Sequence, residues 1–410
     1  MTVLPIDSSS IPELKRSLAE FALDNKTTTQ PFDTPLIEFC ERLSKELFKV
    51  PKLSGYPDLA ALAYWLRKTH LYEIRDRFMS LNSQNERLVP RGIVFHIPPS
   101  NVDTLFIYSW IVSLLVGNPN IIRIPSRENP TISCLLDIVA KLIQEPPFER
   151  IKKATLLISY GHEKEITRLL SHEANVRVVW GGDETIKTIR KIPLPLRAKE
   201  LVFPDRFSAA TIHAKKYSKT ASEEQQQVAS HFFNDLFWFD QRACSSPRAI
   251  FWIGNREDIL AASEVFYHNL TQSIESRKHK IPLGGILEKK AFTYNQSIEL
   301  QAAEIQEIHN TLTVMKIPHP LPGWRRHCGF GLIYHLEFSD LNHIIPFLSG
   351  KDQTLATYGF DHETLTGFAY AVKSLCIDRI VPIGQALSFH TTWDGMDLLQ
   401  ELTRRIRIDV

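Results

Sequence analysis

One cysteine stands in a setting where a thiol could act as a nucleophile. Cys244 lies in the stretch QRACSSPR, residues 241–248, between an apolar aromatic run and a proline. The four other cysteines are scattered and none forms a CxxC pair, so neither a zinc knuckle nor a dithiol redox motif is indicated. Most lone cysteines are buried and inert, whereas an activated one forms covalent acyl intermediates. The surroundings of Cys244 decide between the two.

Asn101 is a candidate partner for that thiol. It follows Pro98 and Pro99 at the end of a short apolar run, and a long apolar segment begins after it. The amide NH₂ group of an asparagine can donate to the oxyanion that forms when a carbonyl is attacked. Its carbonyl oxygen can instead cap a helix that begins at this point. The two roles use different atoms, and residue type and spacing leave both open.

The sequence contains few signals for phosphate or metal binding. Gly181 and Gly182 follow an apolar run and precede a helical pattern, where glycines either admit a ligand to the backbone or form a plain tight turn. No GxGxxG, P-loop, HExxH or GxSxG motif is present. The one close His–Cys pair is His327 with Cys328, and adjacent residues seldom bind one metal. We therefore predict no metal site.

Short apolar runs alternate with helical segments from residue 92 onward, which predicts α/β structure. A long predicted helix at 222–239 leads directly to Cys244. We predict two doubly wound α/β domains, the first of which should bind its ligand at the carboxyl ends of its strands. The predicted organisation is an N-terminal helical region at 1–85, a dinucleotide-binding domain at 86–206, a catalytic domain at 207–390 and a C-terminal segment at 391–410.

Composition excludes several classes of protein. The chain has 410 residues and a net charge of +2, which argues against binding to nucleic acid or to a charged membrane surface. The most apolar run, 105–116, is shorter than the roughly 20 residues that cross a bilayer. The first ten residues lack the pattern of a signal peptide. We therefore expect a cytoplasmic protein without a membrane span, with its five cysteines reduced.

Four stretches resemble the long-chain fatty acyl-CoA reductases of bacterial bioluminescence (LuxC type), within the aldehyde dehydrogenase superfamily. They are residues 94–126, 178–186 (VVWGGDETI), 241–248 and 379–395 (RIVPIGQALSFHTTWDG). The resemblance covers about residues 88–410 and implies an aldehyde-dehydrogenase-like fold with NADPH as cofactor. It implies that Cys244 is the nucleophile and that Asn101 serves the oxyanion hole. The cofactor-binding residues that it implies are Pro98, Pro99, Arg123, Ser126, Gly181, Gly182 and Phe330.

The sequence departs from the aldehyde dehydrogenases at three positions. Their water-activating glutamate falls at or near Phe203, with Glu200 and Asp205 nearby, their ribose-binding glutamate is replaced by Cys328, and a lysine is replaced by Ile124. Hydrolysis of an acyl-cysteine needs an activated water, whereas reduction of a thioester does not. The missing glutamate therefore favours reduction, and whether Glu200 or Asp205 replaces it stays open.

We predict a reductase that converts an acyl-CoA or acyl-carrier thioester to an aldehyde. Arg123 and Arg127 flank Ser126 at the end of a predicted strand, where an arginine can pair with the 2′-phosphate of NADPH. The alternatives are a cysteine-dependent acyltransferase without hydride transfer and a non-catalytic subunit that binds a partner. We also expect a homo-oligomer and an acyl-activating or acyl-transferring partner protein. Acyl chain length, carrier and pathway stay open.

Overall fold

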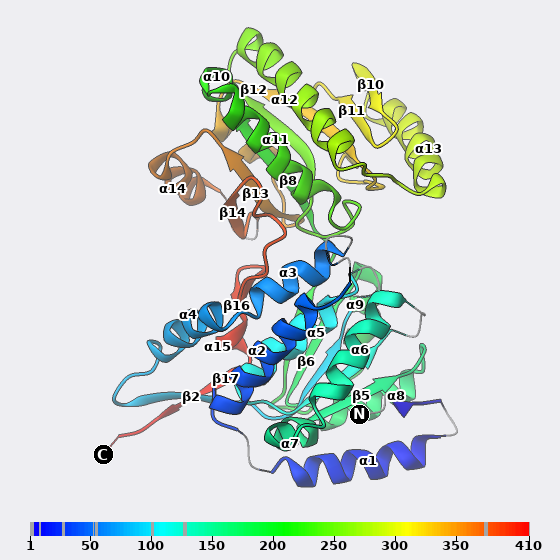
Figure 1. The fold of residues 1–410 in the computed structure, drawn as a ribbon, viewed down its shortest axis with the longest axis vertical. Coiled ribbons are helices and arrows are strands. Elements are labelled where there is room, and N and C mark those ends of the chain that lie inside the picture. Colours follow the sequence, from blue (N-terminus) through cyan, green and yellow to red (C-terminus); the bar gives the residue numbers. More distant parts are fainter. Residues whose placement is uncertain are drawn as a thin grey trace. The chain divides into compact units, whose positions relative to one another are not determined.

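The chain forms two compact units (Figure 1). The computed structural model describes residues 4–7, 10–26, 29–51, 53, 56–99, 102–125, 129–372 and 376–409. Unit 1 consists of Met1–Pro204 with Phe389–Val410, and unit 2 is Asp205–Ser388, so the chain crosses between the units twice. Among the described helices, none combines the length and the apolar character needed to span a membrane.

Unit 1 is built on a six-stranded parallel sheet in the order β1-β5-β4-β3-β6-β7. Its strands are β1 (Leu4–Pro5), β3 (Val94–Ile97), β4 (Asn120–Ile124), β5 (Thr155–Ser159), β6 (Val176–Trp180) and β7 (Lys199–Phe203). From β3 the chain winds outward through β4 and β5, and then it returns to β6 and β7 on the other side. The connections therefore diverge between the neighbouring strands β3 and β6, the point at which doubly wound sheets bind ligands.

Helices cover both faces of this sheet because its strands are apolar on both sides. Val94 and Val178 face the larger layer, whereas Phe95 and Val179 face the smaller one. The larger layer contains α2 (Thr34–Phe48), α3 (Pro57–Trp65), α4 (Lys68–Met79), α5 (Leu105–Leu115), α6 (Pro130–Leu142), the short 3₁₀ helix η3 (Pro146–Phe148) and α7 (Glu149–Lys153). The smaller layer contains α1 (Ile11–Asp24), α8 (Lys164–Glu173) and α9 (Asp183–Arg190).

Buried hydrogen bonds join α5 to the strands β3, β4 and β6. His96 Nε2 donates to Asn120 Oδ1 at 2.9 Å, and His96 Nδ1 accepts from Ser109 Oγ of α5 at 2.8 Å. Trp180 Nε1 donates to the same Ser109 oxygen at 3.1 Å. Burial lowers the pKa of His96 to about 4, so the ring is neutral. Each polar atom of this network thus has a partner, which fixes α5 against β3, β4 and β6.

The C-terminal segment returns to unit 1 and pairs with a strand that lies over 300 residues earlier. β17 (Thr403–Arg407) is antiparallel to β2 (Glu86–Pro90), and α15 (Leu398–Glu401) packs in the larger layer. The short strands β15 (Thr392–Trp393) and β16 (Met396–Asp397) form a hairpin before it.

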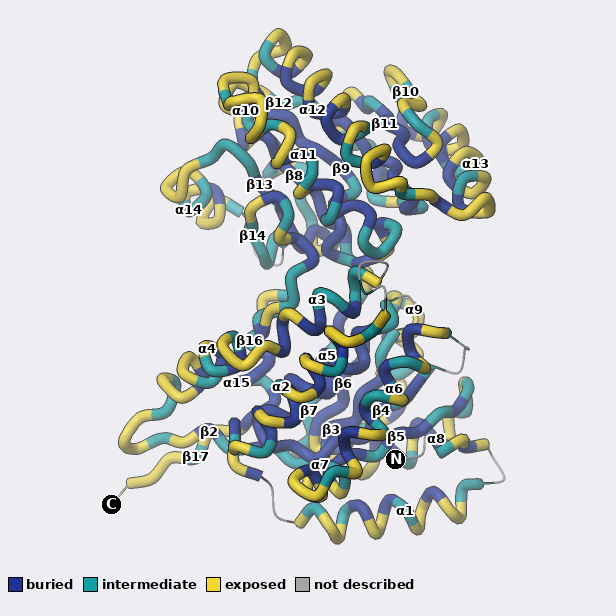
Figure 2. Tube along the Cα trace, in the orientation of Figure 1, coloured by how far each residue is buried: buried dark blue, intermediate teal, exposed yellow. Residues whose placement is uncertain are grey.

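Unit 2 is built on a seven-stranded sheet in the order β10-β11-β12-β9-β8-β13-β14, in which β10 alone is antiparallel. Its strands are β8 (Phe207–His213), β9 (Pro247–Ile253), β10 (Glu304–His309), β11 (Leu312–Lys316), β12 (Leu332–Phe338), β13 (Asp352–Tyr358) and β14 (Arg379–Pro382). Its helices are α10 (Ala214–Lys219), α11 (Ser222–Phe237), α12 (Arg256–Ser276), α13 (Leu283–Glu299), the 3₁₀ helix η4 (Leu341–Phe347) and α14 (His362–Ala371). Figure 2 shows the central strands of the two large sheets as buried and the outer faces of the surrounding helices as exposed.

The predicted α/β class is confirmed, and the departures are local. The helix predicted to begin at Asn101 begins at Leu105, with Thr104 in the N-cap position, and Asn101 itself lies outside the described residues. The turn after β3 is thus longer than predicted, because Val102 and Asp103 still lie outside the helix.

Candidate functional site

Cys244 lies in the turn between α11 and β9, at the amino end of a central strand of unit 2. β9 pairs in parallel with β12 on one side and with β8 on the other, so the segments that precede all three strands meet at this edge. Cys244 is partly exposed, and its carbonyl oxygen accepts from Ser208 Oγ at 2.7 Å. The structure therefore holds this thiol at the surface of a rigid sheet edge.

The other thiols differ from Cys244 in burial or in surroundings, and none of the five cysteines is in a disulfide. Cys40 is fully buried, and burial raises the pKa of its thiol well above the ordinary value. Burial also raises the pKa of Cys328 to about 12. Cys134 and Cys376 are partly exposed, and burial raises their pKa values as well. A raised pKa keeps a thiol protonated at neutral pH and therefore unreactive.

His327, beside Cys328, is occupied by the backbone. Its Nδ1 accepts from the N–H of Gly329 at 3.0 Å, and its Nε2 donates to the carbonyl of Leu332 at 3.0 Å. Burial lowers the pKa of His327 far below its ordinary value, so the ring is neutral and both nitrogens are used. Over the described ranges, no three His, Cys, Asp or Glu side chains gather as metal ligands.

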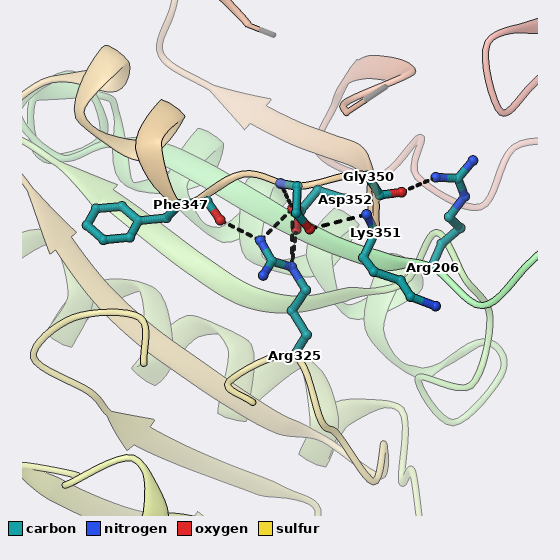
Figure 3. A network of polar contacts seen from close by, with 7 residues as sticks. Arg206, Arg325, Phe347, Gly350, Lys351 and Asp352 are labelled. Atoms are coloured by element: carbon teal, nitrogen blue, oxygen red, sulfur yellow. Dashed lines mark hydrogen bonds and ion pairs between the residues drawn. The ribbon is translucent and has the colours of Figure 1, made fainter. Parts of the chain in front are cut away.

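A polar network anchors the same amino edge of the unit 2 sheet (Figure 3). Asp352 begins β13 and is buried. Arg325 donates hydrogen bonds to its carboxylate from Nε at 3.0 Å and from a terminal nitrogen at 2.6 Å. Arg206 donates to the carbonyl of Gly350 in the segment that precedes β13. A bidentate arginine–carboxylate pair fixes orientation as well as distance. The network therefore joins the segment before β12 to the start of β13, on the edge that carries Cys244.

Unit 1 presents its candidate cofactor residues at the carboxyl ends of adjacent strands. Pro98 and Pro99 follow β3, and Gly181 and Gly182 follow β6, on the two sides of the switch point. A Cβ on Gly182 would meet no heavy atom within 4 Å, so a ligand can approach this backbone closely. Gly182 is also the N-cap residue of α9, whose first turn carries Asp183 and Glu184. That this edge binds a dinucleotide stays a prediction.

Three predicted site residues, Asn101, Ser126 and Arg127, lie outside the described residues. Their flanking segments are described and are tied together. Asn129 Nδ2 donates to Asp103 Oδ2 at 2.8 Å, which links the turn after β3 to the turn after β4. The described residues near these positions, Asp103 and Asn129, are therefore neighbours.

Arg123 is bound within unit 1. Its guanidinium donates to the carbonyl of Gly161 at 2.5 Å and to the carbonyl of Tyr160 at 3.3 Å, and it lies over the Tyr160 ring. These contacts tie the ends of β4 and β5 together. Arg123 would have to leave both carbonyls to pair with a cofactor phosphate.

The position of the missing glutamate is apolar and closed. Phe203 is buried and stacks on Trp180 with ring centroids 3.8 Å apart. Glu200 accepts from the buried Arg177 at 2.6 Å and from Arg190 at 3.1 Å, so both of its oxygens are engaged in ion pairs. Asp205 is exposed, and its backbone carbonyl accepts from Lys351 Nζ at 3.1 Å. Glu200 thus belongs to an ion-pair network with two arginines.

Phe330 lies in unit 2 against the Cys244 turn. Its ring is buried beneath the guanidinium of Arg242 at 4.7 Å, and its N–H donates to the carbonyl of Asp240 at 3.0 Å. A Cβ on Gly285 of α13 would lie 2.7 Å from this ring. The observed role of Phe330 is therefore packing beneath the turn, and its predicted contact with a cofactor stays a prediction.

Sequence reasoning missed three buried polar residues near Cys244. Gln241, Ser208 and Asp235 are each about 1% exposed and bind the backbone of distant segments. Of the three, only Gln241 could have been singled out from the sequence, because it belongs to the QRACSSPR motif. Ser208 and Asp235 sit inside a strand and a helix, where sequence patterns predict packing and not long-range hydrogen bonds.

The chain matches the family model described as "Acyl-CoA reductase (LuxC)" over residues 70–405. It belongs to the LuxC family. It is 25% identical over 323 residues to a long-chain acyl-protein thioester reductase of Aliivibrio fischeri, covering 77% of this chain and 63% of that protein. The reductase of that name from Vibrio harveyi is 24% identical over 374 residues, covering 85% and 74% of the two chains. This LuxC-family chain thus spans less than two thirds of the length of the Aliivibrio protein.

Solved structures confirm the predicted aldehyde-dehydrogenase-like fold. An oxidoreductase from Marinobacter aquaeolei aligns with a TM-score of 0.71 at 11% identity, over 97% of this chain and 90% of its own. Aldehyde dehydrogenase 21 from Physcomitrella patens aligns with a TM-score of 0.69 at 9% identity, over 96% and 90% of the two chains. A glyceraldehyde-3-phosphate dehydrogenase from Methanocaldococcus jannaschii, complexed with NADP, aligns with a TM-score of 0.64 at 12% identity. The alignment covers 98% of this chain and 95% of that one.

Proposed function

We propose that this protein reduces an acyl thioester to an aldehyde, with NADPH as the reductant and Cys244 as the nucleophile. One observation carries the proposal: Cys244 is partly exposed at a sheet edge whose backbone is tied down by buried side chains. The relatives of this chain are named long-chain acyl-protein thioester reductases, which favours a thioester substrate carried by a protein or by CoA. The neighbour complexed with NADP favours a nicotinamide cofactor.

The chemistry assigns one bond to each step. The Cys244 thiolate adds to the acyl carbonyl, and the oxyanion is stabilised by the Asn101 amide and by the N–H of Cys244. The carbon–sulfur bond to the carrier then breaks, and the carrier leaves as a thiol after taking a proton. A bound nicotinamide cofactor would supply the hydride that converts the acyl-cysteine to a thiohemiacetal. Its collapse releases the aldehyde and returns the Cys244 thiolate.

Cofactor binding is assigned to the carboxyl edge of unit 1. The backbone at Pro98–Pro99 and Gly181–Gly182 would hold the dinucleotide, because these turns flank the switch point and Gly182 leaves open space above its backbone. Asn129, which follows Ser126 and Arg127 in the sequence, is joined to Asp103 of the turn after β3 by a hydrogen bond. Arg127 is the better candidate for the 2′-phosphate, because Arg123 already binds two carbonyls.

The site favours reduction over hydrolysis. Phe203 and Trp180 fill the position at which aldehyde dehydrogenases activate water, and Glu200 is held by two arginines. Because Glu200 is held in these ion pairs, we expect it to direct no water at an acyl-cysteine, so hydrolysis should be slow.

The test is incubation with a panel of acyl-CoA and acyl-carrier thioesters plus NADPH, followed at the nicotinamide absorbance. Stoichiometric loss of NADPH and appearance of aldehyde support a reductase. Acyl transfer to an amine or thiol without loss of NADPH would establish the acyltransferase instead. Failure of Cys244 to take up any acyl group would leave the non-catalytic, partner-binding subunit.

A further inference from the structure

The side chain of Gln241 is a buried tie between three backbone segments. Gln241 is 1% exposed, and its Nε2 donates to the carbonyl of Pro247 at 2.8 Å and to the carbonyl of Leu332 at 2.8 Å. Its Oε1 accepts from the N–H of Gly331 at 3.0 Å. One amide group therefore binds the start of β9, the start of β12 and the turn before β12. Such a fully used buried amide specifies a single arrangement of the backbone around it.

The backbone at this point adopts a conformation that side chains disfavour. Asp240 and Gln241 have φ angles of 49° and 60°, two consecutive residues in the left-handed region. A non-glycine residue in this region is strained, because its Cβ lies too close to the following carbonyl oxygen. The chain keeps a glutamine here although a glycine would relieve the strain. The side-chain hydrogen bonds of Gln241 offset that strain and hold the turn in place.

The turn also makes close contact with a second turn that has the same backbone geometry. Gly329, Phe330 and Gly331 all have positive φ, between 57° and 85°. A Cβ on Gly329 would lie 2.8 Å from the carbonyl oxygen of Asp240, so no side chain fits between the two turns. Gln241 bridges them through Gly331, and the N–H of Phe330 donates to Asp240.

A separate side chain fixes the other end of the Cys244 turn. Ser208 Oγ donates to the carbonyl of Cys244 at 2.7 Å and accepts from the N–H of Thr354 at 3.3 Å. The turn is thus anchored three residues before Cys244 by Gln241 and at Cys244 itself by Ser208. The thiol is left partly exposed between two buried anchors.

We propose that Gln241 is a positioning residue, which holds the 240–244 turn so that the Cys244 thiol and N–H keep one geometry toward the acyl carbonyl. The inference rests on the proposed role of Cys244 as nucleophile. Gln241 touches neither the substrate nor the reacting atoms. Its loss should therefore slow acylation of Cys244 without weakening the binding of thioester or cofactor.

Two variants separate the tie from backbone strain and volume. Gln241→Met keeps the volume of the side chain and removes the three hydrogen bonds, and Gln241→Gly removes them while relieving the left-handed backbone. Gln225→Ala is the control, because Gln225 Nε2 donates to the carbonyl of Tyr217 at 2.8 Å near the start of α11, at the end of that helix away from the Cys244 turn. The readouts are kcat and KM for thioester reduction, the melting temperature, and the pH profile of Cys244 alkylation by iodoacetamide.

We expect both Gln241 variants to lower kcat at least tenfold with KM within twofold of the parent, and to shift the pH profile of Cys244 alkylation. Gln225→Ala should lower the melting temperature and leave kcat and the pH profile of Cys244 alkylation unchanged. Folded Gln241 variants with the parent's kcat and alkylation profile would overturn the proposal. If the parent chain reduces no thioester, the proposed function fails, and the alkylation profile still decides whether Gln241 positions the thiol.

Discussion

The carboxylate of Asp235 accepts a hydrogen bond from the N–H of Gly384 at 2.6 Å, across 149 residues of sequence. It also accepts from the N–H of Ala386 at 3.0 Å. Arg379 approaches the same loop with its guanidinium and donates to the carbonyls of Gln385, Ala386 and Ser388 at 3.3–3.4 Å. A buried acid and an arginine thus hold the segment through which the chain leaves unit 2, just before Phe389.

This arrangement predicts a pH-dependent stability. Burial raises the pKa of Asp235 to about 7, against the opposing effect of the hydrogen bonds from Gly384 and Ala386. Because the folded state binds the proton more tightly than the unfolded state, stability should fall as the pH rises from about 4 to about 7. Asp235→Asn should flatten this slope, as measured by urea unfolding at several pH values.

Asp58 provides the matched control for that experiment. Burial raises the pKa of Asp58 in unit 1 to about 6. Asp58→Asn should therefore flatten the fall of stability with pH below pH 6 and leave the fall between pH 6 and 7 unchanged. An Asp235→Asn profile that runs parallel to the parent's between pH 4 and 7 would contradict the assignment.

Sequence patterns predicted most strands of the unit 1 sheet, because the spacing and number of apolar residues in a strand can be read from that segment alone. Strands β3, β4, β5 and β6 are short, mostly apolar runs with buried residues on both faces, which such runs predict, whereas β7 at the sheet edge buries Leu201 and Phe203 on one face. The pairing of β17 with β2 and of β1 with β5 could not be predicted in this way. Those contacts join distant segments, and nothing in either segment alone selects its partner.

The site was predictable where motif and topology coincide. Gly181 and Gly182 stand at the switch point because the strand order puts β6 beside β3, and the alternation of strands and helices already implied that edge. The structural roles of Glu200 and Arg123 were not predictable. Each depends on partners, Arg177 and Tyr160, that only the folded sheet brings within hydrogen-bonding distance.

Cys244 should be the residue that carries the acyl group. Cys244→Ala should abolish the covalent adduct and the NADPH-dependent reduction while leaving cofactor binding intact. Cys328→Ala should leave the adduct unchanged, because burial raises the pKa of Cys328 to about 12 and keeps it protonated. Mass spectrometry after brief exposure to acyl-CoA without NADPH measures both. An adduct mapped to Cys328 would refute the assignment.

Asn101→Ala should slow acylation by roughly 10²- to 10³-fold, the usual effect of removing one oxyanion donor. Because Thr104, and not Asn101, occupies the N-cap position of α5, the variant should not lose the roughly 1 kcal/mol of an N-cap. Single-turnover acylation and thermal unfolding test the two halves separately. Unchanged acylation would remove Asn101 from the oxyanion hole.

Glu200→Gln should change stability and not the product. The variant leaves the buried guanidinium of Arg177 without its charged partner, which costs roughly 3 kcal/mol. Hydrolysis of acyl-CoA in the absence of cofactor should stay as slow as in the parent chain, because Glu200 activates no water. Release of free CoA and free acid is the measurement. A marked fall in that release would identify Glu200 as the base.

Preference for NADPH over NADH should depend on Arg127 more than on Arg123. Arg127→Ala should raise KM for NADPH with little effect on KM for NADH, because the 2′-phosphate loses a charged partner. Arg123→Ala should instead lower the melting temperature, because the Gly161 and Tyr160 carbonyls lose their donor. Steady-state kinetics with both cofactors and thermal unfolding distinguish the two variants. Equal efficiency of the parent chain with NADH and NADPH would refute the preference itself.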